Sequence, residues 1–249
     1  MTRPYLLWLI WQNIDTRQRY HVGNLIYKDD LYIFQYENIK EHRGLKEALL
    51  NGYRPHLAFP NLNKVYISNK LFGPFMRRLP NSGRPDFNLL LSKFGLNESF
   101  LDMDLLRATG GRLATDSYEF VDPVYIEDDH FNFNFYVAGW RYHDGEENLD
   151  LLAEDTQVIF ERETSNSYDS FAVMVKTMDQ HLLGYVPAFY SEFMTDILDE
   201  GYAYSAKIAK IDFNAIPQLK VKIKVVGEVI KNENYNRAES DKLLPLQFI

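Results

Sequence analysis

The chain has no cysteine among its 249 residues. Disulfide bridges and thiolate metal sites are therefore excluded, and we expect a reducing compartment such as the cytoplasm. The six histidines show no spacing typical of paired metal ligands. The apolar run Tyr5–Trp11 is far too short to span a bilayer and lacks a small-residue cleavage site. It predicts a buried strand, and no membrane partner is expected.

The sequence also lacks the common catalytic motifs. It has no Gly-rich loop ending in Lys-Ser/Thr, no kinase catalytic loop and no Gly-x-Ser-x-Gly elbow. Carboxylates are plentiful, but none forms a recognisable catalytic constellation. We therefore predict a binding protein that is not an enzyme, with no catalytic residues, no cofactor and no metal. The alternative is a DNA-processing enzyme, or a subunit of one, whose carboxylates form no familiar pattern.

Positive charge is scarce in the second half of the chain. Residues 1–125 hold 16 Lys/Arg against 13 Asp/Glu, whereas residues 126–249 hold 11 against 22, which gives net charges of +3 and −11. Non-specific binding of polyanions depends on cations that displace counterions. Any DNA contact in the second half must therefore be local and involve few side chains.

Periodicity and turn signals predict an α+β protein with two domains. Residues 1–126 begin with an antiparallel meander and continue with loops and short helices. The acidic stretch 127–134 is expected to be a linker, and the alternating aromatic residues of Phe131–Val137 predict the strand that begins the second half. Residues 135–230 contain short strands with one or two helices, which is typical of a small β-barrel, and residues 231–249 form a polar tail. Helices are predicted over Leu45–Leu50, Asp86–Phe94, Asp102–Thr109 and Phe189–Glu200.

Four segments of the second half follow one another in a specific order. They are Val137–Tyr142, Phe160–Asp169, Ala172–Val175 and Leu183–Pro187. This series resembles the HIRAN family over about residues 135–227, through the elements Gly-x-Arg-Tyr, Arg-Glu-x-x-Asn-x-Tyr-Asp and Gly-Tyr-Val-Pro. The resemblance implies a modified OB-like barrel with a pocket for the 3′ end of single-stranded DNA.

The resemblance also implies a role for individual side chains. Arg141 would hold a phosphate, because a guanidinium makes paired bonds to oxyanions. Tyr142 and Tyr168 would stack on the last two bases, at about 1–3 kcal/mol per base. Asp169 would accept a hydrogen bond from a terminal hydroxyl and repel a terminal phosphate, on a turn held by Asn166. From spacing alone, a structural turn whose tyrosine covers the core is the favoured interpretation of this segment, and the family resemblance reverses that preference in favour of a binding pocket.

The sequence departs from the family pattern at Ser167, Phe171, Tyr185 and Ala188. The last two replace basic or imidazole side chains that help to hold phosphates. The residues expected to contact DNA are Arg141, Tyr142, Asn166, Tyr168, Asp169, Tyr185, Lys220 and Lys222.

Three of the lysines alternate along an expected strand over residues 219–229. Lys220, Lys222 and Lys224 share one face of it, and apolar residues occupy the other. These lysines could follow a DNA backbone, or they could protect an exposed sheet edge from pairing. Edge protection is the favoured interpretation.

The first half contains, in this order, Gly23–Leu25, Pro55–Pro60, the Phe-x-x-x-Leu-Pro-x-x-Gly element Phe75–Gly83, and Asp104–Gly111. This series resembles the small N-terminal subdomain of HipA-type serine/threonine kinases, over Tyr5 to about Phe120. It implies a non-catalytic regulator that docks on a HipA-like (HipT-like) kinase, with a HipB-like DNA-binding protein as a further partner. The alternative is a scaffold for the second half.

The two resemblances together predict a cytoplasmic adaptor or antitoxin-like regulator from a bacterial toxin–antitoxin or phage-defence system. It would bind DNA ends through one half and restrain a kinase through the other. A protein-interaction module without DNA binding is an alternative. Arg77, Arg78 and Arg84 lie near Ser82-Gly83 and could hold a phosphate, although the favoured interpretation is that these arginines are solvated or ion-paired at the surface.

Overall fold

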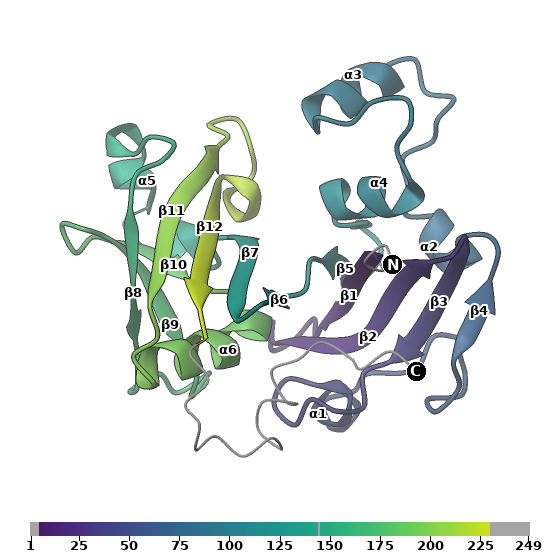
Figure 1. Ribbon diagram of the computed structural model, residues 1–249, viewed down its shortest axis with the longest axis horizontal. Helices are drawn as coiled ribbons and strands as arrows, with labels where there is room; N and C mark the ends of the chain where they lie inside the picture. Colours follow the sequence, from purple (N-terminus) through teal and green to yellow (C-terminus); the bar gives the residue numbers. More distant parts are fainter. Residues whose placement is uncertain (1–4, 144, 230–249) are drawn as a thin grey trace. The chain divides into compact units, whose positions relative to one another are not determined.

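The computed structural model describes residues 5–143 and 145–229 and divides into two compact units, Met1–Pro123 and Val124–Ile249. Each unit combines antiparallel strands with short helices (Figure 1), so the predicted α+β class is confirmed. Within the described ranges, no helix is long and apolar enough to cross a membrane.

The first unit is built on a five-stranded antiparallel sheet of order β4-β3-β2-β1-β5. Its strands are β1 (Tyr5–Gln12), β2 (Arg19–Lys28), β3 (Leu31–Tyr36), β4 (Tyr66–Ser68) and β5 (Tyr118–Val121). The predicted meander is confirmed, and Asp29 and Asp30 make its turn with φ of 50° and 60°. Short Asp side chains tolerate this left-handed conformation better than most residues.

The helices of the first unit are α1 (Leu45–Leu50), α2 (Gly73–Met76), α3 (Phe87–Lys93) and α4 (Asp102–Thr109). Three of them lie where the sequence predicts helices. Helices α1, α2 and α4 contribute to an aromatic-rich core in which the buried Phe34 ring contacts Phe59 and Phe75 at centroid distances of 4.5 and 5.3 Å, whereas α3 packs on α4 in a second, smaller cluster. The abundance of aromatic residues in this half therefore serves packing.

The arginines near Ser82-Gly83 have structural partners. Arg78 is buried, donates to the carbonyl of Gly111 at 3.0 Å and forms an ion pair with Asp116. Arg84 donates to Asp86 at 2.7 Å. The expectation of a surface ion pair is confirmed for Arg84, whereas the ion pair of Arg78 is buried and not at the surface.

The second unit contains two antiparallel sheets, of order β11-β12-β7-β6 and β10-β9-β8. The strands are β6 (Tyr125–Glu127), β7 (His130–Tyr136), β8 (Val158–Arg162), β9 (Val173–Thr177), β10 (Leu182–Tyr185), β11 (Tyr204–Ile211) and β12 (Val221–Glu228). The helical elements are α5 (Gly145–Asn148), α6 (Ala188–Asp199) and the 3-10 turns η1 (Trp140–Tyr142), η2 (Leu149–Leu151) and η3 (Pro217–Leu219).

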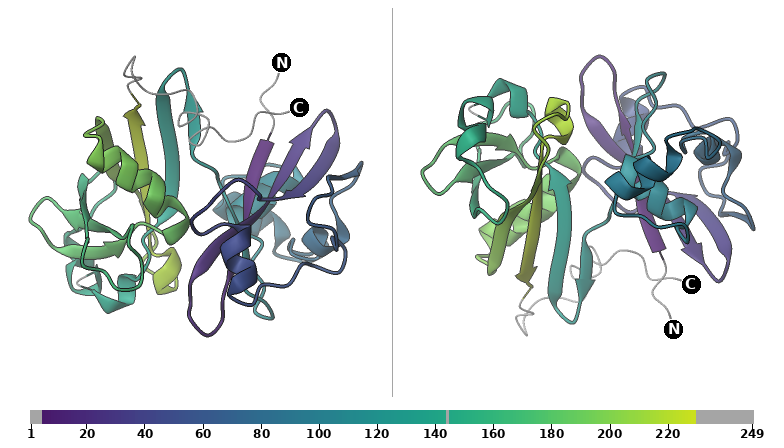
Figure 2. Two further views of the ribbon diagram at one scale, coloured as in Figure 1. Left: turned by 90° about the horizontal axis from the view of Figure 1, so that it is seen from below. Right: turned by 90° about the horizontal axis from the view of Figure 1, so that it is seen from above.

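The core of the second unit lies between α6 and the strands. Phe131, Phe133 and Phe135 alternate along β7 and are buried. Tyr190 and Phe193 of α6 pack on them, and Phe133 lies 5.0 and 5.9 Å from these two rings. Figure 2 shows α6 against the strands from two further sides. The predicted helix and alternating strand are thus confirmed, since their apolar faces meet.

The acidic stretch expected to be a linker is instead part of a β-hairpin. Ile126 pairs with Phe131 and Glu127 with His130. Asp128 and Asp129 form the turn, with φ of 49° and 65°. The run of acids marks a left-handed turn and not a connection between domains, and the boundary between the two units lies before it, after Pro123.

Two further expectations are not met by the topology. The two sheets of the second unit touch at the isolated bridges Ala138–Tyr185 and Gln157–Lys207, and the described strands form no closed ladder. A continuous barrel is therefore not confirmed. Strand β12 lies between β11 and β7. Its lysines cannot protect a sheet edge, so that interpretation is wrong.

Candidate functional site

The Gly-x-Arg-Tyr element lies where the chain passes from one sheet to the other. Val137 N donates to the Val221 carbonyl of β12 at 3.0 Å, and Ala138 then exchanges two hydrogen bonds of 2.9 and 2.8 Å with Tyr185 of β10. Gly184 makes this close approach possible, because a Cβ there would lie 2.3 Å from the Ala138 oxygen and its φ is +143°. The junction fixes η1 beside β10.

Trp140 anchors η1 from the inside. Its ring is buried, and its Nε1 donates to Glu146 Oε1 at 3.0 Å. Lys220 Nζ donates to both oxygens of Glu146 at 2.9 Å. Gly145 lies directly on the indole, since a Cβ there would come within 2.6 Å of the ring. Lys220 thus supports η1 through Glu146, and its ammonium is already engaged.

The two residues after Trp140 are exposed. Tyr142 is 76% exposed, and Arg141 is also exposed, with its guanidinium carbon 5.8 Å from the Tyr142 ring centroid. A planar cation beside an open aromatic face can contact a phosphate and its base together. The buried tryptophan therefore presents this pair of side chains on a fixed turn.

Asn166 shapes the turn between β8 and β9. Its Oδ1 accepts hydrogen bonds from the amides of Tyr168 and Asp169 at 2.9 and 3.0 Å. The prediction of a capped turn is confirmed. Tyr168, however, is 83% exposed. The alternative in which this tyrosine merely covers the core is wrong, because Tyr168 and Tyr142 are the most exposed of the large aromatic side chains in the described ranges.

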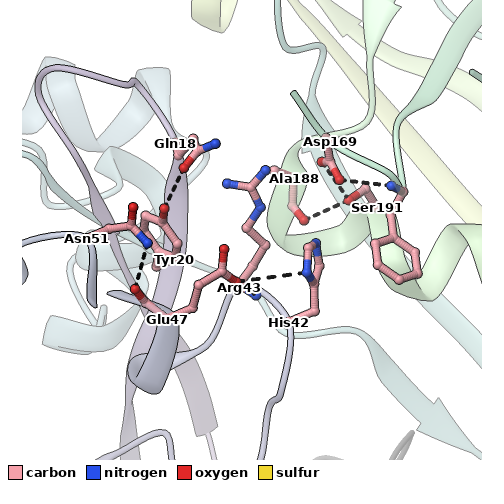
Figure 3. Close-up of polar contacts among 10 residues, drawn as sticks. Gln18, Tyr20, His42, Arg43, Glu47, Asn51, Asp169, Ala188 and Ser191 are labelled. Carbon is pink, nitrogen blue, oxygen red and sulfur yellow. Dashed lines mark hydrogen bonds and ion pairs between the residues drawn. The ribbon is translucent and has the colours of Figure 1, made fainter. Parts of the chain in front are cut away.

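Asp169 is oriented by a backbone amide and by a hydroxyl. Its Oδ1 accepts from Phe171 N at 3.0 Å, and its Oδ2 lies 3.2 Å from Ser191 Oγ (Figure 3). Ser191 is buried in the first turn of α6, where its Oγ also lies 2.8 Å from the Ala188 carbonyl. The helix thus holds the carboxylate at one rotamer while the residue stays partly exposed.

Glu163 connects the turn to the rest of the site. Its Oε2 accepts from Asn166 Nδ2 at 2.5 Å and from the Tyr185 hydroxyl at 2.9 Å. The Tyr185 ring in turn lies edge-to-face with His143, which directly follows η1, at 5.2 Å between centroids. Burial, together with the hydrogen bond and charge of Glu163, raises the pKa of Tyr185 to about 12. Tyr185 is therefore a neutral donor at physiological pH.

Six of the eight predicted contact residues share this framework, namely Arg141, Tyr142, Asn166, Tyr168, Asp169 and Tyr185. The other two do not lie on one strand face as predicted. Lys220 follows η3 and bonds to Glu146, while Lys222 lies on β12 with its ammonium 5.7 Å from the Tyr136 ring centroid. Within the described ranges, no three His, Cys, Asp or Glu side chains are grouped to hold a metal ion.

The sequence prediction missed three side chains of the framework: Glu163, His143 and Ser191. Only Glu163 left a usable signal, because it stands three residues before Asn166 in the Arg-Glu-x-x-Asn element. A side chain three residues before a turn residue is close enough to form a hydrogen bond with it. Its second partner, Tyr185, is distant in sequence, and spacing gave no sign of it.

One family of known proteins matches the part of the chain that carries this site. The family model for the HIRAN domain matches residues 130–229. This segment is a HIRAN domain. The match begins at β7 and includes η1, the Asn166 turn, β10 and both strands of the closing hairpin.

Two solved structures are similar to part of the chain. A crystal structure of a Lactobacillus plantarum protein has 23% sequence identity and a TM-score of 0.34, and the match covers 38% of this chain and 89% of that one. The HIRAN domain of human HLTF has 18% identity and a TM-score of 0.36, with 45% and 85% covered. None of the curated proteins matches the chain.

The bond between Glu163 and Tyr185 can be tested by titration. Replacing Glu163 by Gln removes the negative charge, so the pKa of Tyr185 should fall below about 12. Because the raised pKa favours the protonated phenol in the folded state, its contribution to stability is present at neutral pH and disappears as the pH rises towards this value. The pKa can be followed by NMR of the labelled tyrosine Cζ.

Glu161→Gln is the matched control, since Glu161 lies two residues away and pairs with Lys176. It should leave the Tyr185 titration unchanged. A Tyr185 pKa that is equally high in Glu163→Gln would contradict the shared hydrogen bond.

Proposed function

We propose that the HIRAN domain binds the 3′ end of a single DNA strand. Membership of the HIRAN family suggests a DNA-binding module. The observation that carries the proposal is the joint framework of an exposed arginine, two exposed tyrosines and an oriented carboxylate. Each group supplies one of the contacts that a strand terminus offers: phosphate, base and hydroxyl.

Stacking supplies most of the affinity in this proposal. A base on each of Tyr142 and Tyr168 contributes about 1–3 kcal/mol, and the contribution does not depend on salt. The acidic half has 22 Asp/Glu against 11 Lys/Arg, so phosphate contacts at the end site are few and binding at this site should respond only weakly to ionic strength. Arg141 provides a charge-assisted hydrogen bond to a phosphate, which fixes the position of the DNA strand along the site.

Asp169 gives the site its preference for a free hydroxyl. A carboxylate fixed by Phe171 N and Ser191 can accept a hydrogen bond from a 3′-hydroxyl. It repels a 3′-phosphate, because two anions at hydrogen-bond distance interact unfavourably. We also propose that the chain acts by binding and without catalysis, in a reducing cytoplasm, because it has no cysteine and none of the common catalytic motifs.

Two substitutions separate stacking from end selection. Tyr168→Ala should weaken binding of a fluorescent oligonucleotide by about 1–3 kcal/mol in an anisotropy titration, since one stacked base is lost. Asp169→Asn should remove most of the preference for 3′-hydroxyl over 3′-phosphate ends. Phe213→Ala is the control, because Phe213 is an exposed aromatic of the same unit, at 56%. Unchanged affinity in Tyr168→Ala would overturn the end site.

A second function is proposed for the first unit, which resembles the N-terminal subdomain of HipA-type kinases. We propose that it docks on such a kinase and makes the chain an antitoxin-like regulator. One surface favours a protein partner. Leu50 is 82% exposed at the end of α1, and Ile14 is 68% exposed on the loop after β1. Asn13 Nδ2 donates a hydrogen bond of 2.7 Å to the Asn51 carbonyl, which joins this loop to the end of α1. Clustered exposed apolar side chains are typical of interaction surfaces.

Co-purification tests this docking. The chain should retain a co-expressed HipA-like kinase from the same genome, and the double change Ile14→Glu with Leu50→Glu should release the kinase. Leu89→Glu changes a leucine of α3 that is 73% exposed and should have no effect. Failure of the unaltered chain to bind the kinase would refute the regulatory role and leave DNA-end binding untouched.

A further inference from the structure

The sheet of β11, β12 and β7 has one apolar face and one basic face. Ile208, Ile223 and Phe135 point inward and are buried. On the outer face, Lys207 of β11 stands directly opposite Lys224 of β12, and Lys210 stands opposite Lys222. We call these four residues, Lys207, Lys210, Lys222 and Lys224, the lysine face.

These two cross-strand pairs of lysines repel each other, and like charges directly opposite each other destabilise a sheet. Two of the four ammonium groups have partners: Lys207 forms an ion pair with Asp155, and Lys222 lies over the Tyr136 ring. Lys210 and Lys224 have no carboxylate at ion-pair distance among residues 5–143 and 145–229. The face therefore has excess positive charge that an external anion would neutralise.

The position of these lysines adds to this argument. The half of the chain that carries them has only 11 Lys/Arg against 22 Asp/Glu, and four of the 11 are gathered here. Strand β12 is internal to the sheet, so protection of an edge does not account for Lys222 and Lys224. Repulsion between the lysines lowers the stability of the sheet. A bound polyanion would neutralise this repulsion, and polyanion binding is therefore the most direct function for such a cluster.

We propose that the lysine face binds the phosphate backbone of a single-stranded nucleic acid, independently of any strand terminus. Neighbouring strands lie about 4.8 Å apart, and alternate residues of one strand about 6.7 Å apart. Four ammonium groups on such a grid span several phosphates and exceed what one small anion can contact. The face thus suits a charged chain.

The neighbouring strand favours a single-stranded partner over a duplex. Tyr136 stands opposite Lys222, and Asn134 opposite Lys224, on the same outer face of β7. A tyrosine ring and an amide can contact unpaired bases, which a duplex keeps stacked inside. Further along the sheet, Glu228 pairs with His130 at 3.5 Å and ends the basic region.

A circular single-stranded DNA tests the proposal because it has no ends. The full chain should bind the circle, and Lys210→Gln with Lys224→Gln should weaken that binding. Losing two phosphate contacts should also lower the slope of log affinity against log salt by about 1.4, at roughly 0.7 per contact. The control is Lys70→Gln with Lys93→Gln, which removes two exposed lysines of the first unit and should leave both quantities unchanged.

Stability of the free protein gives a second readout. The lysine double variant should melt at a higher temperature than the unaltered chain when DNA is absent, because repulsion across the sheet is relieved. Wild-type affinity and salt slope in this variant would overturn the proposal. Binding of the unaltered chain to polyglutamate but not to the circle would overturn the assignment to nucleic acid.

The proposals for the lysine face and for the end site can be tested independently of each other. Tyr168→Ala should keep its affinity for the circle and lose affinity only for linear strands. If it instead binds linear strands normally while the lysine variant loses the circle, the end site is refuted and the lysine face stands.

Discussion

The candidate site depends on one carboxylate that serves two donors. Glu163 accepts from Asn166, which folds the turn carrying Tyr168 and Asp169, and from Tyr185, which belongs to the strand beside η1. Hydrogen bonds to an ionised acceptor are shorter and stronger than neutral ones. The exposed side chains of the site are therefore positioned by a partly buried network beneath them. Glu163 thus adds a side-chain link between the turn and β10, beside which the Ala138–Tyr185 bridge already holds η1.

Electrostatics explains why such positioning matters in this protein. An acidic domain cannot hold DNA by general attraction, so every favourable contact has to be placed. Stacking surfaces and a single arginine suit this restriction at the strand end. The lysine face gathers four of the 11 basic residues of this half on one sheet surface. Both features allow local binding of a polyanion by a half-chain that holds 22 acids against 11 bases.

The sequence predicted those parts of the structure that depend on neighbouring residues. The alternation of Phe131, Phe133 and Phe135 predicted β7, and the capping pattern of Asn166 predicted the turn. Contacts between distant segments cannot be predicted from such local patterns. No local pattern indicates that Glu163 meets Tyr185, or that Lys224 faces Lys207, because strand order and register decide both contacts. The Asp128-Asp129 pair was misread as a linker since a short acidic turn and a solvated linker have the same composition.

The most direct measurement is a backbone NMR titration of the labelled protein with a short single strand that ends in a 3′-hydroxyl. We predict that the amide signals of Arg141, Tyr142, Tyr168 and Asp169 shift together and saturate at one ligand concentration, because these residues belong to one framework. Shifts in the turn that saturate apart from those of η1, or no shift in either, would contradict the existence of a single DNA-end site.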